Sequence, residues 1–267
     1  MTLSFPPSTI YGPVQSWRVG LSLGVDLLQV NSICSFRCVY CQLGKINILT
    51  TQRRIFVPTA RILGDLQASD WHRAEIITLS GSGEPTLAAN LGEVIHEIKV
   101  LTQKPVLVLT NSAHLNQQEV RSQLSEADKV FCKVDATDEG GFQRINRPAP
   151  GVSFSAVVES IKQFRREYPG FLGIQFMLTN LNKTEVEALA AILTEIEPDE
   201  VQINAPSRPV PHEWTRTTRG SHERRMSSGS HLKPVLLDEA RQFERSLRNL
   251  TKLKIVSPYH LSMASSN

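Results

Sequence analysis

Long apolar runs are missing from the sequence: no stretch reaches the roughly 18 apolar residues that a membrane-spanning helix needs. The first residues also lack the basic segment and apolar core of a secretory signal peptide. Cysteine is scarce, and its four copies are too few and too clustered for a disulfide framework. The net charge of +3 permits a polyanionic partner but does not require one. We therefore expect a globular protein without membrane contact in the reducing cytoplasm.

Short apolar runs alternate with amphipathic segments over most of the chain. The runs have the length of buried strands, and the segments between them have the spacing of helices with one apolar face. Because such alternation produces a parallel sheet, we predict an α/β fold, a partial (β/α)6 barrel of TIM-like type that is open on one side. The predicted strands are Val19–Gln29, Glu75–Ser80, Pro105–Thr110, Lys129–Val134, Phe171–Leu178 and Glu200–Asn204. The predicted helices are Thr59–Gln67, Leu87–Leu101, Leu115–Leu124, one turn at Phe142–Ile145, Ser153–Glu167 with Ser153 as N-cap, and a helix that follows a capping box at Asn182 and Glu185 and ends near Ile196.

The two ends of the chain break this alternation. Prolines at positions 6, 7 and 13 predict an irregular lead-in over residues 1–18. Residues 207–234 are rich in serine, arginine and histidine and poor in apolar residues, which predicts a basic flexible segment. Residues 235–267 are a short C-terminal extension with an amphipathic helix, a last strand at Lys252–Ser257 and a frayed tail. We therefore divide the chain into a core domain of residues 1–206, the basic segment and the C-terminal extension. The helix of the extension has one apolar face, made of Leu236, Ala240, Phe243, Leu247 and Leu250.

Three of the four cysteines fall within eight residues, at Cys34, Cys38 and Cys41. A loop this short can turn three thiolates toward one metal centre, and thiolates are soft ligands that suit zinc or an iron–sulfur cluster. A closed structural zinc site needs four ligands, but the next cysteine or histidine along the chain is His72. A cubic iron–sulfur cluster with one open iron needs only three. The spacing favours the cluster, with structural zinc as the alternative.

A second motif, Gly81-Ser-Gly-Glu-Pro-Thr86, directly follows the second predicted strand. Glycine lets the backbone approach a ligand closely and adopt positive φ angles. Backbone groups on such a turn can pair with a zwitterion, and Glu84 adds a charge-assisted partner for an ammonium group. The alternative is an ordinary strand-to-helix turn. The cysteine loop one unit earlier in the chain favours the ligand site.

Together, the two motifs resemble those of the radical S-adenosylmethionine (SAM) superfamily, in which an aromatic residue, here Tyr40, precedes the last cysteine. The resemblance implies that the three clustered cysteines hold a single [4Fe–4S] cluster and that SAM chelates its open iron. Residues 10–210 further resemble a bacterial and archaeal group related to the wyosine-base synthases of transfer RNA. The synthases carry a second cluster on extra cysteines, which this chain lacks. The narrower likeness rests on Tyr11-Gly-Pro-Val, Gly20–Asp26, Cys34–Gly44, Phe56-Val-Pro58, Gly81–Thr86, Asn146-Arg-Pro148 and Val201–Asn204.

The resemblance also implies which residues contact SAM and substrate. The glycine-rich turn receives the amino end of SAM, Tyr40 lies by the adenine, and the ends of later strands contact the ribose and methionine parts. For Lys133 and Asp135, a buried ion pair is the alternative. Cys132 points the opposite way along its strand and is expected to be a core thiol. The implied SAM contacts are Tyr40, Gly81, Ser82, Gly83, Glu84, Asn111, Lys133 and Asp135, and the implied substrate contacts are Asn146, Arg147 and Asn204.

The chemistry that the resemblance implies is a reductive cleavage of SAM. An external electron donor such as flavodoxin or ferredoxin reduces the cluster, and SAM yields methionine and a 5′-deoxyadenosyl radical that abstracts hydrogen from an unidentified substrate. RNA is one candidate substrate, and the arginines within residues 208–225 are candidates for contacting it. Two alternatives stay open: an activase that places a glycyl radical on a partner protein, and a non-catalytic zinc-binding module.

Overall fold

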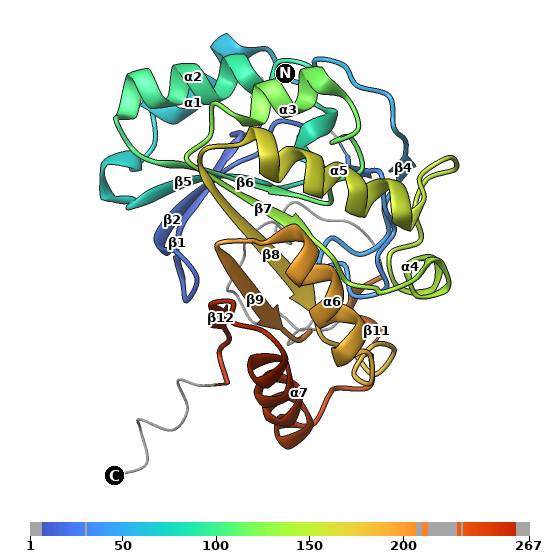
Figure 1. The fold of residues 1–267 in the computed structure, drawn as a ribbon. Coiled ribbons are helices and arrows are strands. Elements are labelled where there is room, and N and C mark those ends of the chain that lie inside the picture. Colours follow the sequence, from blue (N-terminus) through green and yellow to red (C-terminus); the bar gives the residue numbers. More distant parts are fainter. Residues whose placement is uncertain (1–6, 30, 207–209, 213–228, 231, 260–267) are drawn as a thin grey trace.

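The computed structural model describes residues 7–29, 31–206, 210–212, 229–230 and 232–259. Its main feature is one curled sheet with the strand order β1-β2-β5-β6-β7-β8-β9-β12 (Figure 1). All neighbouring strands are parallel except β1 and β2, which are antiparallel. The strands are β1 (Ile10–Ser16), β2 (Gly20–Val25), β5 (Ile76–Leu79), β6 (Val106–Thr110), β7 (Lys129–Lys133), β8 (Phe171–Met177), β9 (Glu200–Asn204) and β12 (Ile255–Val256).

The helices cover the outer face of the curled sheet (Figure 1). Most consecutive helices pack against each other, so they form a layer that follows the curvature of the sheet. The predicted α/β fold with a partial barrel is confirmed. Among the described helices, none has the length and apolar character needed to cross a membrane. The helices are α1 (Thr59–Gln67), α2 (Leu91–Thr102), α3 (Gln118–Leu124), α4 (Glu139–Ile145), α5 (Phe154–Glu167), α6 (Val186–Ile196) and α7 (Leu237–Leu250), and two short 3-10 turns are η1 (Trp71–Arg73) and η2 (Pro85–Leu87).

The two faces of the sheet have different environments, which β6 illustrates. Successive side chains of a strand point to opposite faces. Val106 and Val108 are fully buried in the core between sheet and helices. Leu107 and Leu109 face the concave side, where they line a pocket. The hydrophobic core therefore lies outside the curl, and the inside is left for a binding site.

The irregular lead-in predicted for residues 1–18 is wrong over β1. This strand pairs antiparallel with β2, and the register shifts between Tyr11 and Val14, on either side of Pro13. Proline is tolerated because β1 is the edge strand and Pro13 lies at the irregularity, where no ladder hydrogen bond is lost. The ring of Tyr11 fills the space beside Gly24, where an added Cβ would lie 2.1 Å from it. The hairpin therefore becomes one wall of the concave side.

Of the two helix caps predicted from the sequence, one is confirmed and the other is wrong. Ser153 caps α5, with its hydroxyl accepting from the Ala156 N–H at 3.4 Å, as predicted. The capping box at Asn182 and Glu185 is wrong, because α6 begins after Glu185 without a side-chain cap. Asn182 is instead fully buried. Its amide donates to the carbonyl oxygens of Asp135 and Met177, at 2.8 and 3.0 Å, which joins the loops after β7 and β8.

The C-terminal extension continues the same sheet. Strand β12 pairs in parallel with β9, and Phe243 of α7 stacks on Phe176 of β8 with ring centroids 5.4 Å apart. The predicted apolar face of α7 is shorter than expected, because Leu236 and Leu250 are 66% and 49% exposed. Within the predicted basic segment, β10 (Val210–Pro211) pairs with β11 (Gly229–Ser230). The arginines considered for RNA contact lie outside the described residues.

Candidate functional site

The three clustered cysteines lie on the loop that follows β2. Cys34 belongs to the short strand β3 (Ile33–Cys34), which pairs with β4 (Ile48–Leu49), and Cys38 and Cys41 follow in the loop. All three are partly buried free thiols. Cys132 is fully buried in the hydrophobic core, as predicted. The carboxyl end of the first parallel strand thus carries the candidate ligands.

One side of the loop is held by the glycine-rich turn. The Ile33 N–H donates to the Ser82 carbonyl at 2.9 Å, and the Glu84 N–H donates to the Ile33 carbonyl at 3.1 Å. The two backbones are so close that a Cβ on Gly83 would lie 1.6 Å from the Ile33 carbonyl oxygen. Glycine at 83 is therefore required by the approach of the cysteine loop itself.

The other side of the loop is held by the end of α4. The Arg37 N–H donates to the Asn146 carbonyl at 3.0 Å, and the Val39 N–H donates to the Ile145 carbonyl at 2.9 Å. Phe36 is buried in the core beneath them. Backbone hydrogen bonds thus fix the loop on both sides.

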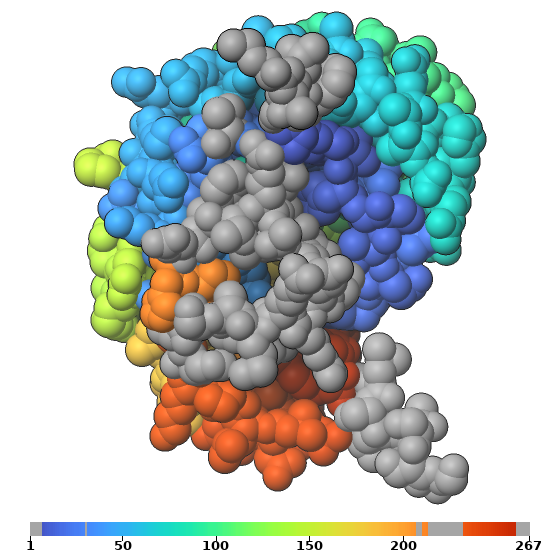
Figure 2. Space-filling model, turned by 180° about the vertical axis from the view of Figure 1, so that it is seen from behind, coloured from blue at the N-terminus to red at the C-terminus, as the bar shows by residue number. Residues whose placement is uncertain are grey.

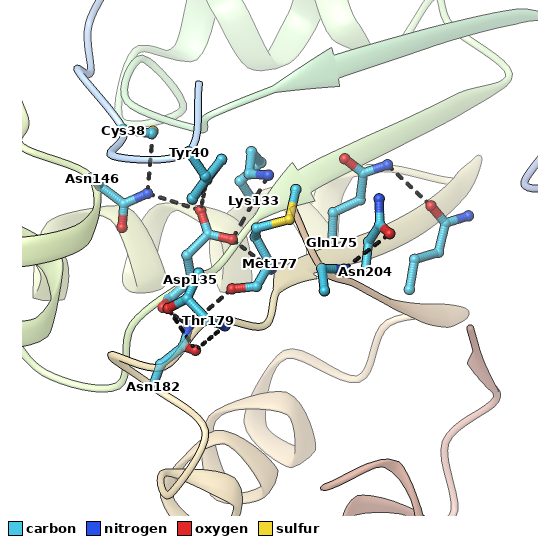
Figure 3. Close-up of polar contacts among 12 residues, drawn as sticks. Cys38, Tyr40, Lys133, Asp135, Asn146, Gln175, Met177, Thr179, Asn182 and Asn204 are labelled. Atoms are coloured by element: carbon cyan, nitrogen blue, oxygen red, sulfur yellow. Dashed lines mark hydrogen bonds and ion pairs between the residues drawn. The ribbon is translucent and has the colours of Figure 1, made fainter. Parts of the chain in front are cut away.

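Two asparagine side chains donate to cysteine sulfurs. Asn111 Nδ2 lies 3.5 Å from Cys34 Sγ, and Asn146 Nδ2 lies 3.5 Å from Cys38 Sγ. The Asn146 amide also donates to Asp135 Oδ2 at 2.8 Å (Figure 3). Hydrogen bonds of this kind stabilise thiolates and tune an iron–sulfur centre. Asn111 was expected at SAM and Asn146 at substrate, so their contacts with sulfur are new information from the structure.

The Glu84 carboxylate is surrounded by protein donors. It accepts from the Thr86 N–H at 3.0 Å and hydroxyl at 2.7 Å, from the Thr110 hydroxyl at 2.7 Å and from the Asn111 N–H at 2.6 Å. Burial raises the pKa of Glu84, and these hydrogen bonds oppose the rise. The side chain joins the ends of β5 and β6. A contact with an ammonium group would therefore come mainly from the backbone of the turn.

Two other residues of the turn, Ser82 and Gly81, differ in whether they face the pocket on the concave side. The Ser82 side chain is fully buried and donates to Asp26 at 2.5 Å. Gly81 lines the pocket, and a Cβ there would lie 2.6 Å from the Asp26 carboxyl carbon. The turn thus presents backbone rather than side chain to a ligand.

Asp135 is a buried junction rather than a pocket residue. Its carboxylate accepts from the Met177 N–H at 2.8 Å and from the Tyr40 hydroxyl, and it lies 3.7 Å from the Lys133 ammonium (Figure 3). Burial, and then the Asp135 charge, raise the pKa of Tyr40. Lys133 lies over the Tyr40 ring, 4.8 Å from its centroid, and lines the pocket. The structure therefore contains the ion pair considered as the alternative, and it leaves Lys133 accessible to a ligand.

Burial changes the acidity of the candidate ligands. It raises the pKa of Cys38 to about 12 and also raises the pKa values of Cys34 and Cys41. A thiol must lose its proton to become a metal ligand, so binding of a metal centre here would release protons.

The concave side of the sheet holds a pocket of about 420 Å³. Its floor is apolar and contains Leu107, Leu109 and Phe131. Its lining residues include the cations Arg18 and Lys133 but no aspartate or glutamate, among the residues that the structure describes. The polar and aromatic lining residues are Tyr11, Ser16, Ser22, Tyr40, Gln42, Thr78, Ser80, Gln175, Gln202 and Asn204.

The three residues expected to contact substrate separate in the structure. Asn204 ends β9 and lines the pocket, and its Oδ1 accepts from the Ala205 N–H at 3.0 Å. Asn146 is buried against the cysteine loop. Arg147 is exposed and lines a different cleft, on the outer side of the loop. Only Asn204 therefore remains a candidate for direct contact with a molecule in the pocket.

Sequence reasoning missed His114 and Gln175, and it did not foresee the pairing of Gln175 with Gln202. His114 is buried, 2.8 Å from the Thr86 hydroxyl and 3.5 Å from the Ser35 hydroxyl, and burial lowers its pKa to about 4. Gln175 Nε2 donates to Gln202 Oε1 at 3.0 Å. Both amides follow the alternation of their strands toward the concave side, which was the signal available in the sequence.

The donor set fits an iron–sulfur cluster. In a [4Fe–4S] cluster each cysteine binds a different iron, so three cysteines leave one iron open. The amide donors on Cys34 and Cys38 stabilise thiolates and suit an anionic cluster.

Comparison with known families now identifies the class. The chain belongs to the radical SAM superfamily, whose family model matches residues 28–193. Members of this superfamily are enzymes that use a [4Fe–4S] cluster and SAM, so the chain is a radical SAM enzyme. Its relatives include the UPF0026 protein slr1464 of Synechocystis sp., which is 47% identical over 83% of this chain and 83% of the relative.

Solved structures show the same fold at low sequence identity. Streptococcus suis SuiB bound to the precursor peptide SuiA has a TM-score of 0.64 and 14% identity, over 89% of this chain and 48% of that one. TYW1 with a lysine–pyruvate adduct bound has a TM-score of 0.62 and 12% identity, over 90% of this chain and 78% of that one. These likenesses establish the fold alone. The narrower relation to the wyosine-base synthases stays a prediction.

Proposed function

We propose that this enzyme binds its cluster through Cys34, Cys38 and Cys41 and acts on an anionic substrate held in the concave pocket. When bound, the reduced cluster and SAM supply a 5′-deoxyadenosyl radical that abstracts a hydrogen atom from the substrate. The observation that carries the proposal is the direct backbone contact between the cysteine loop and the turn Gly81–Glu84. Two backbone hydrogen bonds at Ile33 join them at the carboxyl ends of the strands, beside the pocket.

Different residues of the chain bind different parts of SAM. The backbone at Gly81, at the edge of the pocket, offers carbonyl and N–H groups to the amino acid end. Lys133, which lines the pocket beside Tyr40, offers an ammonium group to a carboxylate. Tyr40 is held by Asp135 and offers its ring to the adenine. The apolar floor excludes water from the region where hydrogen is abstracted.

The charge of the pocket supports the substrate class. Among the described lining residues, Arg18 and Lys133 are cationic and no side chain is acidic. Arg18 on the hairpin lines the same pocket as Lys133, so a phosphate or carboxylate of the substrate would meet positive charge there. A nucleotide, free or within RNA, meets this requirement and also offers a base edge to amides such as Asn204. A glycyl-radical activase would instead insert a peptide backbone, for which a cation is not needed.

The test is anaerobic reconstitution with iron and sulfide, followed by reduction with dithionite and SAM. Wild type is expected to bind about four irons per chain and to form 5′-deoxyadenosine. Alanine variants of Cys34, Cys38 and Cys41 are expected to lose both properties. Cys132→Ala is the matched control and is expected to keep them, since Cys132 lies in the core. Zinc without iron and sulfide, or iron retained in all four variants, would overturn the proposal.

A further inference from the structure

Three exposed arginines belong to the cysteine loop and to the segment at the end of α4 that is hydrogen-bonded to it. Arg37 belongs to the loop, between Cys34 and Cys38, while Arg144 and Arg147 belong to the end of α4, and all three are exposed. The Arg37 N–H donates to the Arg147 carbonyl at 3.1 Å, so the two segments are in direct contact. Figure 2 shows the yellow-green segment that includes α4 at the left edge of the molecule, beside light-blue residues that follow the cysteine loop in the sequence. Positive charge therefore gathers over the backbone that carries the cluster ligands.

These charges are not neutralised within the described part of the chain. None of Arg37, Arg144 and Arg147 forms an ion pair there, whereas Arg121 and Arg165 each pair with a carboxylate. The nearest carboxylates along the chain have other partners. Asp138 accepts from the Gly141 N–H at 2.6 Å, and Glu139 accepts from the Phe154 N–H at 2.7 Å. The three guanidinium groups are thus available to an external anion.

Apolar side chains accompany the arginines. A cleft of about 510 Å³ on this side is lined by Val39, Arg144, Arg147, Leu181 and Leu232. Leu181 is 44% exposed and lies in the same cleft as Arg144 and Arg147. Val39 directly follows Cys38, so the cleft reaches the backbone of the ligand loop. The surface thus combines positive charge, apolar area and closeness to the cluster ligands.

We infer that this surface, made of Arg37, Val39, Arg144, Arg147 and Leu181, docks the acidic one-electron carrier protein that reduces the cluster. The inference rests on the proposed function, because a reductant is needed only if the cysteine loop holds the cluster. Electron tunnelling weakens steeply with distance, so a carrier must dock where the cluster is nearest the surface. Carriers of the flavodoxin or ferredoxin type are acidic, and complementary charge directs their encounter with a basic surface.

A protein fits this surface better than RNA does. An RNA substrate has to place a nucleotide in the concave pocket, whose cations are Arg18 and Lys133. The arginine surface does not share a lining residue with that pocket. Its exposed Leu181 and half-buried Val39 also suit a protein interface, where apolar residues lie among arginines, rather than a phosphate backbone.

The experiment measures cluster reduction in the reconstituted enzyme by rapid mixing. The surface variant is Arg37→Gln/Arg144→Gln/Arg147→Gln. The control variant is Arg73→Gln/Arg166→Gln/Lys252→Gln, which removes three exposed charges from other faces. With reduced flavodoxin at low salt, the surface variant is expected to react at least about tenfold more slowly than wild type, and the control at the wild-type rate. The wild-type rate should fall steeply with added salt, and the surface variant's rate should not.

Dithionite provides the second readout. It is a small reductant that needs no docking surface, so the surface variant should match wild type in its rate and in iron content. Equal flavodoxin rates in all three proteins would overturn the docking inference. A surface variant that is reduced slowly by dithionite as well as by flavodoxin would also overturn it, because that result would show damage to the cluster. A surface variant that loses affinity for bulk transfer RNA but keeps its flavodoxin rate would assign the surface to RNA instead.

Failure of the proposed function gives a different result, because wild type itself would then bind no cluster that dithionite can reduce. The single variant Arg37→Gln guards against misfolding of the triple variant. It is expected to slow the flavodoxin reaction by about twofold to threefold, in line with one of three charges lost.

Discussion

The side-chain amide nitrogen of Asn111 lies 3.5 Å from the sulfur of Cys34. The backbone N–H of the same residue donates to Glu84, which fixes its position at the end of β6. A donor to a thiolate stabilises the more negative, reduced cluster more than the oxidised one. Asn111→Ala is therefore expected to lower the midpoint potential of the reconstituted cluster by on the order of tens of millivolts. A redox titration followed by electron paramagnetic resonance measures the shift.

Asn116→Ala is the control for this prediction, since Asn116 is an exposed asparagine five positions further along the chain. Its potential should equal that of wild type. An unchanged potential in Asn111→Ala, with iron content retained, would show that the amide does not act on the cluster.

Gly83 is expected to tolerate no side chain. A Cβ there would lie 1.6 Å from the Ile33 carbonyl oxygen, which is backbone and cannot move aside without breaking the pairing of turn and loop. We expect Gly83→Ala to lower the free energy of unfolding by about 3 kcal/mol or more and to impair cluster assembly. Gly64→Ala in α1, where no atom lies within 4 Å, should be neutral or stabilising by up to about 1 kcal/mol. Urea denaturation compares the two, and similar stabilities would contradict the prediction.

The periodicity of the sequence predicted the parallel strands because each is a local apolar run. It did not predict β1, because whether an edge strand accepts a proline depends on its partner, β2, and on the irregularity between Tyr11 and Val14. The capping box predicted at Asn182 is wrong for the same reason, since the partners of Asn182 are set by the tertiary structure. Its spacing to Glu185 imitates a capping box, but its hydrogen bonds go to Asp135 and Met177, which the sequence does not place beside it.

The candidate site could be inferred from the sequence where its residues lie close together along the chain. Cys34, Cys38 and Cys41 belong to one short loop, so their spacing alone indicated a metal centre. The roles of Asn111 and Asn146 depend on which sulfur each amide reaches, and this is decided by the packing of β6 and α4 on the loop. No sequence pattern contains that information.

His114 makes stability depend on pH. Burial, followed by the charge of Arg53, lowers its pKa from 6.5 to about 4 in the folded protein. The unfolded chain therefore binds the proton more readily, and stability that is complete above pH 6.5 is lost as the pH falls toward 4. Between about pH 7.5 and about pH 5.5, this group should remove about 1 kcal/mol of unfolding free energy. Denaturation of wild type and His114→Gln at several pH values measures the difference, and equal slopes would assign the pH dependence to other groups.

Lys133 is the pocket cation that the structure places next to Tyr40, 4.8 Å from the ring centroid. If it holds the carboxylate of SAM, Lys133→Gln removes a charge-assisted hydrogen bond of about 1.5–3 kcal/mol, which weakens SAM binding roughly tenfold to a hundredfold. Equilibrium dialysis with SAM on the reconstituted protein gives the dissociation constant. Lys129→Gln is the matched control, because Lys129 lies on the same strand but contacts Phe171, away from the pocket lining. Equal weakening in both variants would indicate a general effect of charge, whereas an unchanged constant in Lys133→Gln would free Lys133 to act with Arg18 on the anionic substrate.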